Sequence, residues 1–132
     1  MSIKFRNTLL AAIALILGTF AVAAPAQAGC NGTKCYGSVV TNPNSTAYGY
    51  AYNRVSGRSA NNAAQANCPG NCRIYVIFRN SCGAIAVGRN GVYGWAQHKS
   101  RSAAKRNAVR NCAKYGSGCK LRVWSCTRYS RS

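Results

Sequence analysis

The chain has 132 residues, with 18 Lys and Arg, no Asp or Glu, and a formal net charge of +18 at pH 7. Without a side-chain carboxylate there can be no paired-carboxylate glycosidase, no Ser-His-Asp triad and no carboxylate-held calcium or magnesium site. Most hydrolytic chemistry is thereby excluded, so we expect a protein that is not an enzyme and that uses no cofactor.

Residues 1–28 have the pattern of a signal peptide. Lys4 and Arg6 precede an apolar run over residues 9–22, and Ala26-Gln27-Ala28 is a small-residue cleavage site. The apolar run is too short, and too closely followed by the cleavage site, for a stable membrane span. We expect cleavage after Ala28 and a secreted or periplasmic mature chain. An uncleaved membrane anchor is the alternative.

The remaining residues, 29–132, suffice for one domain with a modest core. A short lead at 29–35 precedes a domain at 36–132, which contains a tandem repeat with units at 36–81 and 82–127. A repeat in which glycines, aromatic residues and cysteines recur at matched positions predicts a duplicated structural unit. The matched positions are Gly37 with Gly83, Tyr48-Gly49-Tyr50 with Tyr93-Gly94-Trp95, Cys68 with Cys112, Cys72 with Cys119, and Val76 with Val123.

The first unit predicts two strands, a helix and a third strand. Turn residues at 42–45 separate strands at 36–41 and 47–52, and Tyr48, Tyr50 and Tyr52 alternate onto one face of the second. A helix follows, with an N-cap at Ser56 or Ser59 and with Ala60, Ala63, Ala64 and Cys68 at helical spacing. The strand at 72–78 places Ile74, Val76 and Phe78 on one face.

The second unit predicts the same order. Strands at 83–87 and 92–96 flank Asn90-Gly91, a hairpin signal. A helix begins at Ser100 or Ser102 and runs to about Lys114, with Ala104, Ala108 and Cys112 one turn apart. In the last strand, 119–126, alternation predicts that Leu121 and Val123 face the core while Lys120, Arg122 and Trp124 point outward.

Each unit is therefore predicted as β-β-α-β. We expect an α+β domain in which two such units share one core around a pseudo-twofold axis, with the helices on the outer faces of the sheet.

All eight cysteines lie beyond residue 28. In an exported small domain, an even number of cysteines indicates disulfides rather than a metal site, because zinc binding at Cys68-x3-Cys72 would need thiolates in a reducing compartment. The repeat pairs Cys68 with Cys72 and Cys112 with Cys119, each joining a helix end to the next strand. For the remaining four cysteines our preferred pairing is Cys30 with Cys35 and Cys82 with Cys126.

The central motif is Phe78-Arg-Asn-Ser-Cys-Gly-Ala-Ile-Ala86, flanked by the two aromatic-Gly-aromatic triplets and by Val123-Trp-Ser-Cys-Thr127. In these motifs the chain resembles the bacterial family DUF4189, over about residues 36–127. The resemblance implies an exported, cysteine-containing module with no agreed activity. It supplies no catalytic residues.

The basic residues are concentrated in the second unit. On the helix, Lys99, Arg106 and Arg110 are expected on one side, and Arg73, Tyr75, Lys120, Arg122 and Trp124 are candidates for a basic face interleaved with aromatics. Packing of Tyr75 and Trp124 under the helices is the alternative. His98, the only histidine, has no acidic partner and is interpreted as a solvated loop residue. The candidate polyanion-binding residues are Lys99, Arg101, Lys105, Arg106, Arg110, Lys120, Arg122 and Trp124.

Three functional hypotheses follow. The leading one is a cationic binding module for an anionic macromolecule or envelope surface: lipopolysaccharide, teichoic acid, acidic glycan, nucleic acid or an anionic membrane. The second is an effector or inhibitor that binds a host or competitor protein through the hairpin around Asn90-Gly91 and Tyr93. A membrane-active toxin is the third, and the absence of a helix with a strong apolar face argues against it.

The absence of carboxylates predicts acid tolerance. Acid unfolding mostly protonates carboxylates that the native state uses, and this sequence has none on its side chains. From pH 7 to pH 3 the free energy of unfolding should change by less than about 1 kcal/mol. Circular dichroism during an acid titration measures this, and cooperative unfolding near pH 3 would contradict it.

Overall fold

The computed structural model describes residues 29–30 and 32–130. The expected signal peptide at residues 1–28 lies outside this range. Within it, none of the helices is long and apolar enough to cross a membrane.

The β-β-α-β order predicted for each unit is confirmed. The first unit consists of β1 (Tyr36–Thr41), β2 (Tyr48–Arg54), α1 (Gly57–Ala66) and β3 (Ile74–Arg79). The second consists of β4 (Cys82–Val87), β5 (Tyr93–His98), α2 (Arg101–Ala113) and β6 (Lys120–Cys126), with a short 3-10 turn, η1 (Arg89–Gly91), between β4 and β5.

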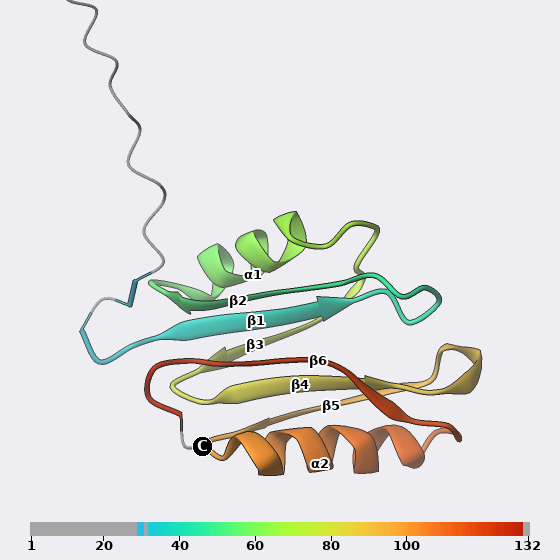
Figure 1. Ribbon diagram of the computed structural model, residues 1–132. Coiled ribbons are helices and arrows are strands. Elements are labelled where there is room, and N and C mark those ends of the chain that lie inside the picture. Colours follow the sequence, from blue (N-terminus) through green and yellow to red (C-terminus); the bar gives the residue numbers. More distant parts are fainter. Residues whose placement is uncertain (1–28, 31, 131–132) are drawn as a thin grey trace, which may run out of the picture.

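Each unit forms its own antiparallel three-stranded sheet. The strand orders are β2-β1-β3 and β5-β4-β6, so the first strand of each unit is central. The two sheets stack face to face, with α1 covering the outer face of one and α2 that of the other (Figure 1). The expected placement of the helices on outer faces is therefore confirmed.

Local signals determine where these elements begin and turn. Ser56 and Ser100 are the N-caps, and their side chains accept hydrogen bonds from the backbone N–H groups of Ser59 and Ala103. Between β4 and β5, Asn90 and Gly91 both adopt positive φ. Two such residues make the tight turn that matches the twist of paired strands.

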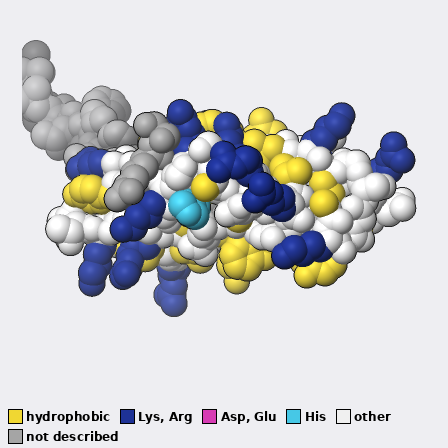
Figure 2. Space-filling model, turned by 90° about the horizontal axis from the view of Figure 1, so that it is seen from below, with side chains coloured by type: hydrophobic (Ala, Val, Ile, Leu, Met, Phe, Trp, Pro, Cys, Tyr) yellow, Lys and Arg dark blue, Asp and Glu magenta, His cyan; other side chains and the backbone are white. Residues whose placement is uncertain are grey.

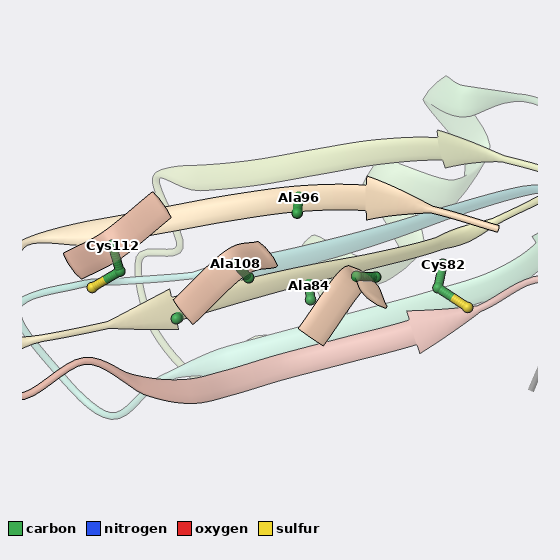
Figure 3. Packing of buried hydrophobic residues seen from close by; sticks show 7 residues of the cluster. Cys82, Ala84, Ala96, Ala108 and Cys112 are labelled. Carbon is green, nitrogen blue, oxygen red and sulfur yellow. The ribbon is translucent and has the colours of Figure 1, made fainter. Parts of the chain in front are cut away.

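The buried side chains form three clusters. The cluster between the sheets is shared by the two units and is the largest in side-chain size; it contains Val39, Val76, Phe78, Ile85, Val87 and Val123. A second cluster lies between the sheet of the first unit and α1. The third lies under α2, where Ala84, Ala96 and Ala108 face one another with Cys82 and Cys112 at its ends (Figure 3). Small side chains let the helices lie close to the sheets.

The matched aromatic-Gly-aromatic triplets have a packing reason. A Cβ at Gly49 would overlap the backbone carbonyl of Ala64, and one at Gly94 would overlap the backbone of Cys112. Each helix thus rests directly on a glycine of the edge strand, and no other residue fits there.

Phe78 lies between the two units. Its ring is 1% exposed, and a Cβ added at either Gly37 or Gly83 would overlap it. These glycines occupy equivalent positions on β1 and β4. By register, the counterpart of Phe78 in the second unit is Ser125, which pairs with Gly83 as Phe78 pairs with Gly37. One ring therefore fills the space on both sides of the pseudo-twofold axis.

The last strand departs from the alternation predicted for it. The pairing of β4 with β6 shifts between Ile85 and Ala86, whose partners are Val123 and Leu121, so that Arg122 is bulged. Val123 packs between the sheets, whereas Leu121 packs under α2. The prediction that both face one core was wrong, because a β-bulge adds a residue and reverses the faces beyond it.

All four predicted disulfides are confirmed. Cys68–Cys72 and Cys112–Cys119 join each helix end to the strand that follows. Cys82–Cys126 links neighbouring residues of β4 and β6, and Cys30–Cys35 closes the lead segment.

Replacing Phe78 by Ala should lower the free energy of unfolding by about 3–5 kcal/mol, because the cavity would open between both sheets at once. Urea denaturation of the oxidised protein measures this. Tyr75→Ala is the matched control on the same strand, since Tyr75 is 55% exposed, and should cost less than about 1 kcal/mol. Similar losses in both variants would refute the role given to Phe78.

Candidate functional site

Trp124 on β6 lies beside α2 under two cations. Lys105 Nζ is 4.3 Å and Arg101 Cζ 5.5 Å from the centre of the ring, which is 37% exposed. Contacts of this kind contribute about 0.5–1 kcal/mol each at exposed sites. The aromatic ring thus holds two positive charges at fixed places on the surface.

Two further cations continue this surface along α2. A shallow hollow of about 380 Å³ is lined by Lys105, Arg106 and Arg110, with Val109 and Leu121 as its apolar part. We call Arg101, Lys105, Arg106, Arg110 and Trp124 the basic face. It combines cations with an aromatic ring and an apolar hollow. The sequence analysis named the cations and the aromatic residue as candidates, but it did not predict the hollow.

The cations of the basic face repel one another along α2. Arg101 with Lys105 and Arg106 with Arg110 are like charges four residues apart, and each such pair costs about 0.2–0.5 kcal/mol on a helix. The first turn of α2 has no acidic residue and carries Arg101, which opposes the helix dipole. An anion bound here would relieve all of these repulsions.

Three predicted members lie elsewhere. Lys99 is exposed and precedes the N-cap Ser100, so it lies outside α2, the helix that carries Arg106 and Arg110. Lys120 is exposed at the start of β6. Arg122 sits in the bulge, and its Nη1 donates to the backbone carbonyl of Ser45 in the first unit.

The proposed combination of Arg73 and Tyr75 with β6 was also wrong. Val76 and Val123 both pack between the sheets, so the neighbouring Tyr75 and Trp124 face the helix layers on opposite sides of the molecule. Trp124 faces α2 but remains 37% exposed beside it, so it is not packed under the helix. Tyr75 is 55% exposed on the side of α1.

His98 ends β5 and is exposed. Its Nδ1 accepts a hydrogen bond from the backbone N–H of Ser100, at 2.9 Å. The imidazole therefore supports the residue that caps α2, and the side chain contacts no acidic group because the sequence has none.

Lys and Arg side chains are spread over the whole α2 side of the molecule, with hydrophobic side chains between them (Figure 2). No acidic side chain interrupts them. The positive potential therefore extends beyond the basic face, and what distinguishes that face is the aromatic and apolar surface among its cations.

A second feature was not predicted from the sequence. A cleft of about 830 Å³ runs between β5 and α2 and is lined by Trp95, Asn107 and Asn111 among others. Asn111 Nδ2 donates to the carbonyl of Trp95 at 2.8 Å, and its counterpart Asn67 donates to that of Tyr50. The repeated Asn-Cys dipeptide at the two helix ends was the available signal. Asn90, Gly91 and Tyr93, the hairpin of the protein-interface hypothesis, also line this cleft.

Comparisons with known proteins found a matching family and a similar solved structure. The model of a family described as a domain of unknown function, DUF4189, matches residues 36–126. The NMR structure of Rv1813c from Mycobacterium tuberculosis is similar, with a TM-score of 0.53 and 25% identity over 70% of this chain and 74% of that one. A search of curated proteins found no match.

Reversing one charge of the basic face should stabilise the fold. Arg106→Glu replaces a like-charge pair with Arg110 by an attractive one, so the free energy of unfolding should rise by about 0.5–1 kcal/mol at low salt. Thermal unfolding measures it, and the gain should fade as salt is added. Arg128→Glu, in an exposed turn, is the control for overall charge. An equal gain there would mean that the helical pair is not the cause.

Proposed function

The chain belongs to the DUF4189 family, and we propose that it is an exported, disulfide-bonded binding module that contacts anionic partners through its basic face. The partner is an anionic macromolecule or an envelope surface that presents repeated negative charges. Export is part of the proposal: the N-terminal sequence pattern supports it, and four disulfides suit an oxidising compartment.

The observation that carries the proposal is the contact of Lys105 and Arg101 with Trp124 beside Arg106 and Arg110. In a protein without acidic side chains, these charges have no internal partner. Trp124 offsets the repulsion between Arg101 and Lys105, whereas holding Arg106 beside Arg110 costs stability, and a bound anion would regain that cost. A surface maintained at such a cost is typical of a binding site.

The spacing of the cations suits a polymer. Residues four apart on a helix are separated by about 6 Å along its axis, at about 1.5 Å per residue. The pairs Arg101 with Lys105 and Arg106 with Arg110 thus form two short rows of charge. A polymer with regularly spaced phosphates, sulfates or carboxylates can contact both rows, whereas a single small anion reaches one.

Binding of the oxidised protein, residues 29–132, to heparin, DNA, lipopolysaccharide and anionic vesicles across a salt series tests the proposal. We expect one of these to bind at 0.15 M salt with clear preference. The triple variant Lys105→Gln, Arg106→Gln, Arg110→Gln should lose that preference. For duplex DNA, the slope of log K against log salt should flatten by about 0.9 for each lost contact.

The matched control is Arg58→Gln, Arg73→Gln, Arg79→Gln, which removes the same charge from exposed positions of the first unit. It should weaken binding far less than the α2 triple. If the two triple variants had equal effects, or if every ligand bound equally well and salt abolished the binding, the attraction would come from net charge alone. A defined site would then be refuted. Strong binding to a protein partner that salt does not weaken would favour the effector hypothesis instead.

A further inference from the structure

Three tyrosines of β2 point away from α1 and toward the second unit. Gly49 and Ala51 of the same strand face α1, since a Cβ at Gly49 would overlap the backbone of that helix and Ala51 packs in the cluster beneath it. Because side chains alternate along a strand, the tyrosines lie on the opposite face. There they line a hollow of about 440 Å³ whose other wall is formed by residues 122–126 of β6. We call them the tyrosine row: Tyr48, Tyr50 and Tyr52.

The tyrosine row is an aromatic surface that stays open to solvent. Its three rings are 46%, 46% and 48% exposed in chain order. The rings of Tyr50 and Tyr52 are nearly parallel, at 12°, and their centres are 6.5 Å apart. Alternate residues of a strand repeat about every 6.6 Å, so the row offers flat rings at regular intervals along β2. Contiguous apolar surface of this kind marks a place where another molecule binds.

Arginines lie near both ends of the row. Arg122 reaches the turn before β2, where its Nη1 donates to the carbonyl of Ser45. At the other end of β2, the backbone N–H of Arg128 donates to Asn53 Oδ1 at 2.7 Å. No carboxylate of a side chain neutralises either arginine, because the sequence has none. The surface around the rings is therefore positive along its whole length.

The tyrosine row and the basic face lie on the two sides of β6. Trp124 belongs to both surfaces, because it lines the hollow and its ring contacts Lys105 and Arg101 on the side of α2. β6 is an edge strand, so only the width of this strand separates the two surfaces. One polymer strand that lies along β6 can therefore contact both.

The open edge of β6 adds hydrogen-bonding groups between the two surfaces. Thr127 N–H donates to the carbonyl of Ser81 at 3.0 Å, in continuation of the ladder between β4 and β6. Hydrogen-bonded and non-hydrogen-bonded residues alternate along an antiparallel ladder, so the backbone N–H and C=O groups of Trp124 and Cys126 point away from β4. These groups are available to the polar edge of a ligand that lies on the tyrosine row.

We propose that bases of a single-stranded nucleic acid stack on the tyrosine row while its phosphates lie on the basic face. This rests on the proposed function, since it names the anionic polymer that the basic face binds. Each residue of such a strand carries one flat aromatic base and one phosphate, and aromatic rings beside cations match both parts. Acidic glycans, teichoic acid and lipopolysaccharide carry anions without aromatic rings. A duplex keeps its bases stacked on one another, so they cannot reach the tyrosines.

The second unit provides a matched control. By register, Trp95 on β5 is the counterpart of Tyr50, and its ring is 49% exposed. Gln97 stands where the first unit has Tyr52, so the row of rings is incomplete there. β5 is also the edge of its sheet opposite to β6, away from Trp124 and its cations. We therefore assign the bases to the tyrosine row of β2.

Fluorescence anisotropy with the oxidised protein at about 0.15 M salt tests the assignment. The probes are an oligothymidylate dodecamer and an abasic dodecamer, which has the same sugar-phosphate chain and charge but no bases. We expect oligothymidylate to bind at least about tenfold more tightly. Tyr50→Ala should lower its affinity about tenfold and leave that of the abasic strand unchanged, because only a stacking contact is lost. Tyr50→Phe keeps the ring and should keep the affinity.

Further variants separate this inference from the proposed function. The triple α2 variant of the basic face should weaken both strands by the same factor, because it removes phosphate contacts alone. If the two strands bound equally and both depended on the α2 cations, base stacking would be refuted and the basic face would stand. If the triple variant weakened neither strand while Tyr50→Ala still weakened oligothymidylate alone, the basic face would be refuted and the stacking contact would stand.

Two more results would overturn the assignment. Trp95→Ala should change neither affinity by more than about twofold, so a loss equal to that of Tyr50→Ala would mean that any exposed ring suffices. Polyglutamate, an anionic peptide, should bind equally well to the unaltered protein and to Tyr50→Ala. If it lost as much affinity as oligothymidylate, the tyrosine row would bind a protein partner and not bases.

Discussion

The contact of the Phe78 ring with Gly37 and Gly83 joins the two repeats into one structure. Each repeat by itself is a three-stranded sheet with a helix on one face, and its other face is apolar. Burial of that face requires the second sheet. The ring fits only because both central strands lack a side chain where they meet it. The Phe78 ring therefore limits how closely the two central strands can approach at this point.

This arrangement also explains why the symmetry is incomplete. Two phenylalanines could not both occupy the axis, so the second unit carries Ser125 at the equivalent position. The last strand then differs from its counterpart by the bulge at Arg122, whose side chain reaches the carbonyl of Ser45 in the other unit. Trp124 occupies the position of Ile77 in the first unit, and it faces α2 and meets Lys105. The basic face therefore depends on the aromatic side chain at this position and on the cations of α2, and not on the bulge.

The sequence was sufficient for the order of elements and for the disulfides at the two helix ends, because duplication gives each of these assignments a second instance. Matched glycines and cysteines mark the same junctions twice. It was insufficient at Arg122, since a bulge leaves no trace in an alternating pattern of apolar and polar residues. The cleft along β5 was missed for another reason. Its components are backbone groups of an edge strand and the amide of Asn111, and neither stands out by periodicity or charge.

Helix α2 separates two kinds of surface chemistry by its geometry. Ala104 and Ala108 face the sheet, so residues on either side of this line flank different strands. Lys105 lies toward β6 and its tryptophan, whereas Asn111 lies toward the open edge of β5. The flank toward β6 carries cations around an aromatic ring, whereas the flank toward β5 combines amide side chains and backbone groups with Lys114. The same helix therefore presents different chemistry on its two sides, because the small residues that pack on the sheet fix which side chains reach each neighbouring strand.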